Sequence, residues 1–592
     1  MSMLDVRSLY VTYLSEEERV EAVRGIDFSA EEGKVTGIVG ESGSGKSTAM
    51  LAVMGLLDHK AAVEAEKVSL FGNTVRAGDN AAIIFQDPLK CLNPTVKIGR
   101  QIAETVRNRK KCTWREAKKR SEELLDSVGI RHPGLRMKQY PFELSGGMRQ
   151  RVVIAIALAC EPNLIVADEP TTALDAAMQV RVIRLLKKIV KETNTALLLV
   201  SHNMGVIAAA CDYVYVMKDG KMIENGCADD IFYNPQTEYT KKLLSDATAE
   251  QLLVKEKVFA AQENPLFTVR HLKKQFQNEE GVNDVSFDIC EGEVFALAGE
   301  SGSGKTTLAK ILTGLEQPDS GEVFCRGERV DRKNRKKDKN MHGKVRMIFQ
   351  DPYSSLNPCM TINEMLTETL RAKEKQIKFD QKERKKDRQR QIEQMLTRVG
   401  LSSLDGKRYP RELSGGQRQK AAIARALLLE PELLICDEAV SSLDAATRTQ
   451  ILDLLLQVVK EKKIACLFIS HDMALIRRIS HRTGVLYKGT LAECAKTRDL
   501  CRDPWHPYTK VLLDSVMPPD PLKARKQKVP AVHEGKSEGG CPYFGSCGYK
   551  MEMCKDAAPE MYDFEGRAVS CHLYSEQQRA GRNPNYKMTS QI

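Results

Sequence analysis

The feature that most constrains this chain is a glycine-rich segment that occurs twice. Residues 40–48 read Gly-Glu-Ser-Gly-Ser-Gly-Lys-Ser-Thr and fit the phosphate-binding pattern G-x-x-x-x-G-K-[ST]. An apolar, strand-like stretch (35–39) precedes this segment and a helix-like stretch (49–54) follows it, which is the context that the pattern requires. Residues 299–307 repeat the segment with one change, 259 positions later. Two such P-loops predict two α/β units, each built to hold a nucleotide.

Each P-loop predicts the same phosphate chemistry. Its glycines let backbone amides wrap a phosphate at the start of a helix, where the helix dipole favours an anion. The lysine is expected to reach the β- and γ-phosphates, and the hydroxyl of Ser47 or Thr306 to hold Mg²⁺. The expected binding residues are Gly40, Ser42, Gly43, Gly45, Lys46, Ser47 and Thr48 in the first copy, and Gly299, Ser301, Gly302, Gly304, Lys305, Thr306 and Thr307 in the second.

A glutamine and an aromatic residue also recur around each P-loop. Gln86 and Gln350 follow apolar strands, and a glutamine at a strand end can contact Mg²⁺ or the attacking water. Tyr13 and Phe276 close the first strand of each half, ahead of the P-loop. We expect their rings to stack on adenine, with packing in the core as the alternative.

A second phosphate cradle follows in each half. The residues are Ser145, Gly146 and Gly147 in the first half, and Ser414, Gly415 and Gly416 in the second. Each group precedes a long amphipathic stretch, 149–160 or 418–429, and Ser-Gly-Gly at a helix start suits an anion. Because a half with one nucleotide has no use for two cradles, we predict that each half lends its cradle to the ATP held by the other.

Residues suited to hydrolysis close two later strands of each half. They are Asp168, Glu169 and His202 in the first half, and Asp437, Glu438 and His471 in the second. An aspartate beside a P-loop would hold Mg²⁺ through water, and the glutamate after it would orient or deprotonate the attacking water. We expect the histidine, which lies beyond a further core strand, to contact the γ-phosphate.

The spacing of these motifs indicates a tandem duplication. The offset between halves is 259 at the P-loop lysine, 264 at the glutamine and 269 from the Ser-Gly-Gly serine onward. The added length falls where the second half carries two basic stretches, 326–344 and 371–390. We expect these to be solvated surface, with contact to anionic lipid as the alternative. They hold almost no aromatic residues for stacking, so despite the net charge of +11 we expect no nucleic-acid partner.

The P-loop, glutamine, Ser-Gly-Gly, Asp-Glu and histidine, in that order and twice, resemble the ATP-binding cassette (ABC) family. The resemblance implies two tandem P-loop domains, each a RecA-like α/β core with antiparallel β and helical subdomains, pairing head to tail within the chain so that no homodimer is required. One ATP site would then use Ser414 and the other Ser145. We expect a first domain at 1–245, a linker at 246–264, a second domain at 265–520 and a tail at 521–592.

A finer resemblance lies at the end of each half. Residues 234–240 and 503–509 resemble the closing segment of the ATPases of dipeptide, oligopeptide and nickel importers. This implies an ATP- and Mg²⁺-dependent energy-coupling subunit, cytoplasmic and peripheral on the inner face of the cell membrane. Its partners would be two transmembrane permease subunits and an extracytoplasmic substrate-binding protein. The alternatives are a soluble tandem ABC ATPase, such as an activator of methyl-coenzyme M reductase, and a regulatory binding module.

Four cysteines mark the tail: Cys541, Cys547, Cys554 and Cys571. Four thiols within 31 residues suggest a metal centre in a chain whose P-loops indicate a reducing compartment. The spacing C-x₅-C-x₆-C-x₁₆-C does not select a zinc ribbon. It resembles the cysteine-rich ends of some peptide-importer ATPases, which implies a [4Fe–4S] cluster; zinc and unligated thiols are the alternatives.

Overall fold

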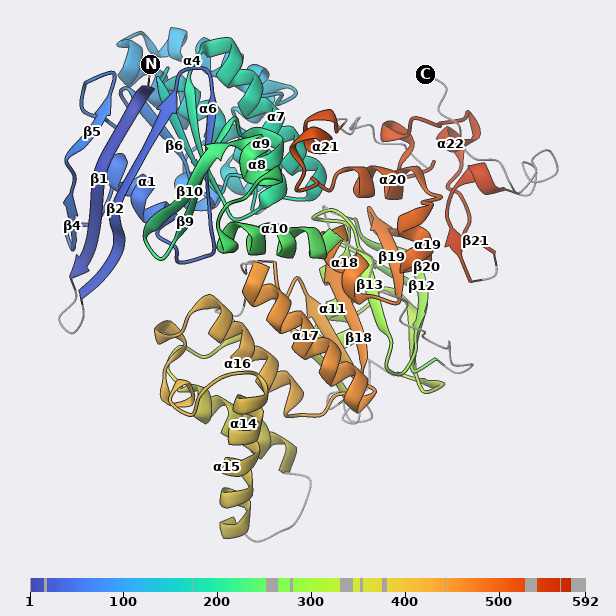
Figure 1. The fold of residues 1–592 in the computed structure, drawn as a ribbon. Coiled ribbons are helices and arrows are strands. Elements are labelled where there is room, and N and C mark those ends of the chain that lie inside the picture. The colour runs from blue at the N-terminus through green and yellow to red at the C-terminus, as the bar shows by residue number, and fades with distance from the viewer. Residues whose placement is uncertain are drawn as a thin grey trace. The chain divides into compact units, whose positions relative to one another are not determined.

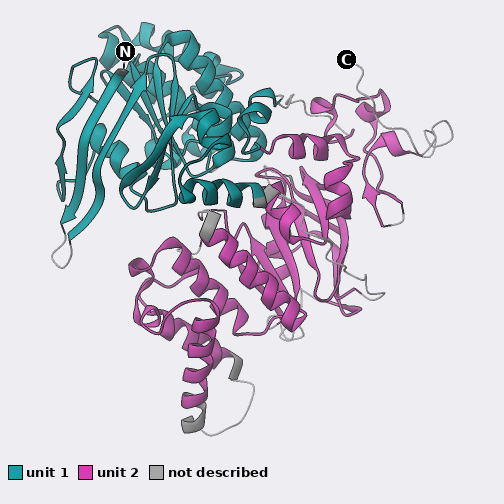
Figure 2. Ribbon diagram, in the orientation of Figure 1, with its two compact units in different colours: residues 1–250, 517–529 teal, residues 251–516, 530–592 magenta. Residues whose placement is uncertain are grey.

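The chain folds as two compact units. The computed structural model describes residues 2–14, 19–172, 174–251, 265–276, 280–330, 344–351, 355–374, 381–441, 443, 445–527, 540–564 and 566–575. Unit 1 comprises Met1–Glu250 and Met517–Val529, and unit 2 comprises Gln251–Val516 and Pro530–Ile592 (Figure 2). Each unit is described by itself below.

The core of unit 1 is a six-stranded sheet in the order β10-β9-β3-β8-β7-β6. Its strands are β3 (Val35–Val39), β6 (Ala81–Ile84), β7 (Leu164–Asp168), β8 (Ala196–Ser201), β9 (Tyr213–Lys218) and β10 (Lys221–Cys227). All neighbours pair in parallel except β9 and β10. Both faces of the sheet pack into hydrophobic clusters, so its central strands are buried along their length and read as continuous hydrophobic runs.

A second, antiparallel sheet and a helical segment complete unit 1 (Figure 1). The sheet contains β1 (Ser2–Leu14), β2 (Arg19–Glu31), β4 (Ala61–Glu64) and β5 (Lys67–Leu70). The helices are α1 (Lys46–Val53), α2 (Pro88–Cys91), α3 (Ile98–Lys110), α4 (Trp114–Ser127), α5 (Pro133–Arg136), α6 (Gly146–Ala159), α7 (Ala176–Thr193), α8 (Met204–Ala210), α9 (Ala228–Tyr233), α10 (Glu238–Gln251) and α21 (Pro521–Lys526).

Unit 2 repeats this plan. Its core strands are β13 (Val294–Ala298), β16 (Val345–Ile348), β17 (Leu433–Asp437), β18 (Ala465–Ser470), β19 (Arg482–Tyr487) and β20 (Thr490–Lys496). Its antiparallel sheet contains β11 (Phe267–Gln275), β12 (Glu280–Ile289), β14 (Ser320–Cys325) and β15 (Glu328–Arg329). Its helices are α11 (Lys305–Thr313), α14 (Ile362–Glu374), α15 (Gln381–Arg398), α16 (Gly415–Leu427), α17 (Ala445–Lys462), α18 (Met473–Ile479), α19 (Thr497–Arg502), α20 (Pro507–Asp514) and α22 (Met553–Asp556). The expected α/β fold with antiparallel and helical subdomains is confirmed in both units.

The cysteine-rich tail is joined to the core sheet of unit 2. Strand β22 (Ala568–Val569) pairs with β20, and β21 (Tyr562–Asp563) pairs with β22, so the sheet grows to eight strands (Figure 1). A two-residue strand carries almost no periodicity, and the sequence therefore did not predict this pairing. The tail is an extension of the second unit's fold.

Residues 517–527, which span the expected border between the second domain and the tail, belong to unit 1. The hydroxyl of Tyr233 donates to Asp520 at 2.8 Å, and Arg525 forms an ion pair with Asp229 at 3.3 Å. Unit 1 therefore includes residues on both sides of position 520, where we expect the second domain to end.

Several expected features fall wholly or partly outside the described residues. These include most of the 246–264 linker, of which residues 246–251 end helix α10, and residues 331–343 and 375–380 of the two basic stretches. Within the described residues, no helix combines the length and the apolar character that crossing a bilayer demands.

Candidate active sites

Each P-loop connects a central strand to a helix through glycines that no other residue could replace. The loop joins β3 to α1 in unit 1 and β13 to α11 in unit 2. Gly45 has φ 96°, and a Cβ there would lie 2.4 Å from the carbonyl oxygen of Ala22. Gly304 has φ 99°, and its Cβ would lie 2.1 Å from the carbonyl oxygen of Gly281. The close backbone approach therefore requires glycine at both positions.

The P-loop lysines are buried and folded over their own loops. Lys46 donates to the carbonyl oxygens of Gly40 at 2.8 Å and Glu41 at 2.7 Å, and to the Ser44 hydroxyl at 3.2 Å. Lys305 makes the same three contacts, at the same distances, in unit 2. The two loops thus have one geometry, in keeping with their nearly identical sequences.

The hydrolysis residues of unit 1 meet because the order of the strands places their carboxyl ends side by side. Gln86 follows β6, Glu169 follows β7 and His202 follows β8, and these three strands are neighbours. The Gln86 amide donates to Glu169 Oε2 at 2.8 Å, and His202 Nδ1 lies 2.6 Å from Glu169 Oε1. The hydroxyl of Thr172 also donates to Glu169, at 3.0 Å. The glutamate is the centre of this network.

Unit 2 assembles the equivalent network. The Gln350 amide donates to Glu438 Oε2 at 2.8 Å, and His471 Nδ1 lies 3.1 Å from Glu438 Oε1. The structure therefore brings together the glutamine, glutamate and histidine singled out from the sequence, twice and in the same arrangement.

Both glutamates are kept ionised despite burial. Burial would raise the pKa of Glu169, but the hydrogen bond and charge of His202 outweigh it and leave the pKa below its ordinary value. The same balance, with His471, lowers the pKa of Glu438. Both residues also adopt left-handed backbone, with φ 47° and 46°, which costs about 1–3 kcal/mol each. Strain of this kind is typical of residues held in place for chemistry.

The aspartates before these glutamates suit a divalent cation. The Ser47 hydroxyl donates to Asp168 Oδ1 at 3.1 Å, which joins two of the residues predicted to act around Mg²⁺ in unit 1. Burial, and then the neighbouring glutamate, raise the pKa of Asp168 and of Asp437. Asp437 is 3% exposed, and its Oδ1 is buried with no hydrogen-bond partner. A buried carboxylate oxygen without a donor is the environment that Mg²⁺ would satisfy.

The serines of the two cradles cap the helices that they begin. Ser145 accepts from the Met148 amide at 3.4 Å, and Ser414 accepts from the Gln417 amide at 3.2 Å. Gln417 returns the contact by accepting from the Ser414 amide at 3.0 Å, which completes a capping box. Met148 has no side-chain oxygen with which to accept from the Ser145 amide. The first cradle therefore has one capping hydrogen bond where the second has two.

The two aromatic residues expected to contact adenine lie on the antiparallel sheets. Tyr13 is half-buried and packs against the core of unit 1. Phe276 is 40% exposed, with the ammonium of Lys274 at 5.5 Å from its ring centre. Adenine stacking stays a prediction for both.

The structure adds residues that sequence reasoning missed. Thr172 donates to Glu169, as described above. The hydroxyls of Tyr239 and Tyr508 accept the P-loop amides of Glu41 and Glu300. A signal existed for the tyrosines, which keep the 269-residue offset of the catalytic residues.

Three of the four tail cysteines are buried, and Cys547 is half-buried. Cys541, Cys554 and Cys571 are each 8% exposed, and all four are free thiols. Burial, together with the nearby thiols of the other three, raises the pKa of Cys571 to about 12. Four thiols are a donor set that suits a thiolate-held metal centre. Their positions in the structure do not form one, because within the described residues no three His, Cys, Asp or Glu side chains are placed to hold a metal ion.

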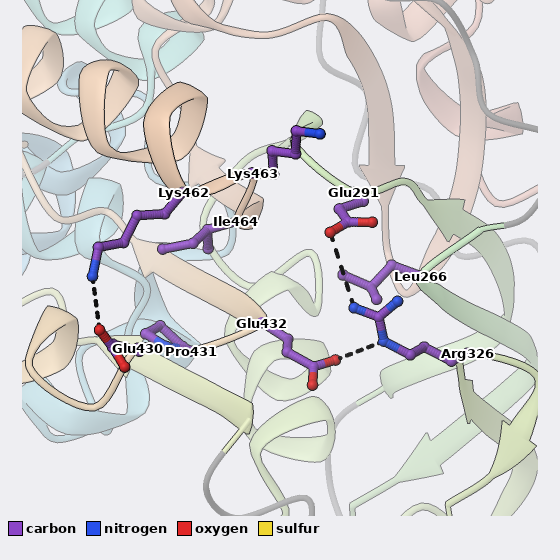
Figure 3. Close-up of a pocket in the computed structure, with 9 residues that line it drawn as sticks. All are labelled: Leu266, Glu291, Arg326, Glu430, Pro431, Glu432, Lys462, Lys463 and Ile464. Atoms are coloured by element: carbon purple, nitrogen blue, oxygen red, sulfur yellow. Dashed lines mark hydrogen bonds and ion pairs between the residues drawn. The ribbon is translucent and has the colours of Figure 1, made fainter.

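A separate groove of about 330 Å³ lies in unit 2, at the amino ends of the core strands and away from the P-loop (Figure 3). Glu291, Glu432 and Ile464, which line it, stand shortly before β13, β17 and β18, whereas the P-loop follows the other end of β13. Arg326 spans the groove between Glu291 and Glu432. This groove is therefore not the nucleotide site.

Comparison with known proteins finds a matching family and similar proteins. Residues 23–172 and 282–441 match the model of the ABC transporter family. Residues 492–554 match the C-terminal region of oligopeptide and dipeptide transporters. The glutathione import ATP-binding protein GsiA of Escherichia coli (strain K12) is 38% identical over 578 residues, covering 89% of this chain and 92% of the relative. The protein of the same name from Shigella dysenteriae serotype 1 (strain Sd197) gives the same figures.

Among solved structures, an archaeal ribosome recycling factor in complex with a ribosomal stalk protein aligns over 81% of this chain and 88% of its own length. The TM-score is 0.53 and the sequence identity 20%, so this likeness concerns the fold alone.

Proposed function

The chain belongs to the ABC transporter ATPase family, and from this we propose that it is the energy-coupling subunit of an importer of short peptides, glutathione among them. ABC ATPases bind ATP with Mg²⁺ and hydrolyse it, and this chain carries the two networks that such hydrolysis needs. The observation that carries the substrate class is the match of residues 492–554 to peptide transporters, together with the relatives' similarity over nearly the whole chain. That similarity also disfavours the soluble alternative.

We assign the same division of labour to both sites. Lys46 and Lys305 bind the phosphates, while Ser47, Thr306, Gln86 and Gln350 act with Asp168 and Asp437 around Mg²⁺. Glu169 and Glu438 take the proton of the attacking water, since each is ionised and held by a histidine. We expect His202 and His471 to orient these glutamates and to contact the γ-phosphate.

We further propose that each ATP is completed by the opposite unit, with Ser414 serving the first P-loop and Ser145 the second. Two observations support this. Each cradle is an exposed helix start capped by its own serine, with its glycines open to solvent or half-buried. Each unit also has a full hydrolysis network without it. Closure on ATP and opening on hydrolysis would then drive the permeases.

A pair of matched variants tests this reciprocity. In a Lys305→Ala chain only the first P-loop can bind ATP. We expect Ser414→Arg to abolish the remaining turnover, while Ser145→Arg leaves it nearly unchanged. The reverse result would show that each unit uses its own serine.

Transport is tested on the complex from native membranes, purified through a tag on this chain and placed in liposomes. We expect two permease subunits to be recovered, and ATP-driven uptake of labelled glutathione or short peptides when the binding protein is present. Nickel chelate and longer peptides serve as competing substrates. Recovery of the chain without any membrane protein would contradict the importer function.

For the tail we propose a [4Fe–4S] cluster held by Cys541, Cys547, Cys554 and Cys571, with the thiols drawing together on ligation. The support is their number, the burial of Cys541, Cys554 and Cys571, the packing of Cys541, Cys547 and Cys554 in one hydrophobic cluster, and the effect of these three thiols on the pKa of Cys571. Anaerobic purification should give about four iron and four sulfide per chain, with absorption near 400 nm, and Cys571→Ser should lose both. Stoichiometric zinc would point instead to a zinc site.

A further inference from the structure

We propose that Tyr239 and Tyr508 are positioning residues that hold the P-loops for ATP, and that the cysteine-rich tail controls the second of them. The two tyrosines begin the helices that close the two halves, in the segments 234–240 and 503–509. Neither the hydrolysis network nor the cradles use these segments. The inference rests on the proposed nucleotide sites and adds a support for each.

The contact is a single hydrogen bond to the first variable residue of each P-loop. Tyr239 Oη accepts from the Glu41 amide at 3.2 Å, and Tyr508 Oη accepts from the Glu300 amide at 3.1 Å. The carbonyl of the same glutamate accepts from the P-loop lysine, at 2.7 Å in both units. When the lysine turns to the phosphates, its hydrogen bond to that carbonyl is given up. The tyrosine still holds the backbone amide of the same glutamate. The tyrosine therefore keeps the loop in place while its lysine changes partners.

A carboxylate on β10 in unit 1, and on β20 in unit 2, sets the position of the tyrosine. Glu224 on β10 accepts the amides of Gln236 and Thr237, at 2.7 and 3.0 Å. Glu493 on β20 accepts the amides of Trp505 at 3.1 Å and His506 at 2.9 Å.

In each case the capping residue then binds the next turn of the chain. Thr237 Oγ1 accepts from the Thr240 amide at 3.2 Å, and His506 Nδ1 accepts from the Tyr508 amide at 3.0 Å. The same device thus aims both tyrosines at their P-loops.

The two copies differ in what covers the tyrosine. Tyr239 is half-buried, with the Lys218 ammonium 4.9 Å from its ring centre. Tyr508 is 1% exposed and packs against Tyr543, which stands between the first two tail cysteines, with ring centres 5.5 Å apart.

A second link runs from the tail to the same carboxylate. Arg567 forms an ion pair at 2.9 Å with Glu493, which is completely buried. The guanidinium also lies 3.8 Å from the ring centre of Trp505. Among the described residues the tail therefore supports the second tyrosine, directly through Tyr543 and indirectly through Arg567 and Glu493.

The test measures MgATP affinity one site at a time, by titration with a fluorescent ATP analogue. A Lys46→Ala chain reports on the second site and a Lys305→Ala chain on the first. We expect Tyr508→Phe to raise the Kd of the second site, and Tyr239→Phe that of the first, by at least about 2-fold and up to about 10-fold, as for one neutral hydrogen bond. A rise below 2-fold at both sites would overturn the positioning role.

The tail is tested with Tyr543→Ala in the same two backgrounds. We expect it to weaken the second site alone, and to add nothing to Tyr508→Phe, because both act through one hydroxyl. Equal weakening of both sites, or full additivity, would overturn the link. If Tyr543→Ala acted on stability alone, it would lower the unfolding temperature of the chain. The Kd of the second site, measured well below that temperature, would then not change. A chain with both lysines replaced that still binds ATP would instead refute the nucleotide sites themselves.

Discussion

The sharpest test of the active sites is the replacement of both catalytic glutamates by glutamine. In the structure Glu169 accepts from His202 through one carboxylate oxygen, and from Gln86 and Thr172 through the other. Glutamine keeps the size and one accepting oxygen, and its amide can face the histidine nitrogen. The double variant Glu169→Gln, Glu438→Gln should therefore keep its fold and its P-loops while losing both general bases.

The expected loss is that of general-base catalysis, about 10²- to 10⁴-fold in turnover, or about 2.7–5.4 kcal/mol of barrier. Phosphate release under saturating MgATP measures the turnover, and titration with a fluorescent ATP analogue measures binding. We expect Kd to change little, because no P-loop contact involves these side chains. Glu238→Gln, at a side chain that is 91% exposed, makes the same chemical change as a control.

The single variants separate two models of the chain. If the sites work independently, Glu169→Gln should leave about half of the turnover. If they close and open together, as we propose, it should leave well under half. Turnover within tenfold of the parent in the double variant would refute the assignment of the glutamates, and parallel loss of binding and turnover would show that the substitution acts on the nucleotide pocket instead.

Three further outcomes follow from the structure. Removal of Mg²⁺ by chelation should abolish turnover, and Asp437→Asn should raise the Mg²⁺ concentration for half-maximal turnover by about 10- to 100-fold at the second site. Burial lowers the pKa of His471, but the bond and charge of Glu438 outweigh it and raise the pKa above 6.5, while the pKa of Glu438 lies below 4.5. The stability that the raised pKa of His471 contributes is thus fully present below pH 6.5 and is lost as the pH rises through the folded pKa. The stability that the lowered pKa of Glu438 contributes is lost as the pH falls below 4.5. His471→Gln should therefore reduce the unfolding midpoint most between about pH 4.5 and 6.5. Finally, Glu493→Ala should destabilise unit 2 by about 3–5 kcal/mol in denaturant unfolding, because Arg567 and two backbone amides lose their buried acceptor. The double variant Glu493→Ala, Arg567→Met should recover part of that loss.

The sequence singles out residues that the structure then brings together, because each belongs to a local pattern. A P-loop is recognised from nine consecutive residues, and Asp168 or Asp437 from the apolar strand before it. What local patterns leave out is the order of strands, and hence that Gln86, Glu169 and His202 share hydrogen bonds. That order, β3-β8-β7-β6, is set by packing between distant segments.

The tail and its contacts show the same limit more strongly. Arg567 has no sequence signal, since it stands beside a two-residue strand and finds its partner 74 positions earlier. Tyr239 and Tyr508 lie in segments whose likeness to importer ATPases is visible, but their target, an amide on a P-loop, is some 200 residues away. Non-local contacts of single side chains leave no periodicity to read.

The spacing of the two halves shows which part of each cassette is fixed in length. The offset grows from 259 to 269 between the P-loop lysine and the Ser-Gly-Gly serine, and is then constant to the closing tyrosine. In the constant part, each strand must deliver a group to the same edge of the sheet, and the last turn must return a hydroxyl to the P-loop. An added residue there would shift a catalytic group along its strand by about 3.3 Å, more than a hydrogen bond tolerates. The Ser-Gly-Gly cradle, the Asp-Glu pair, the histidine and the closing tyrosine therefore form one stretch whose spacing is set by geometry, while the added length of the second half falls between the P-loop and that stretch.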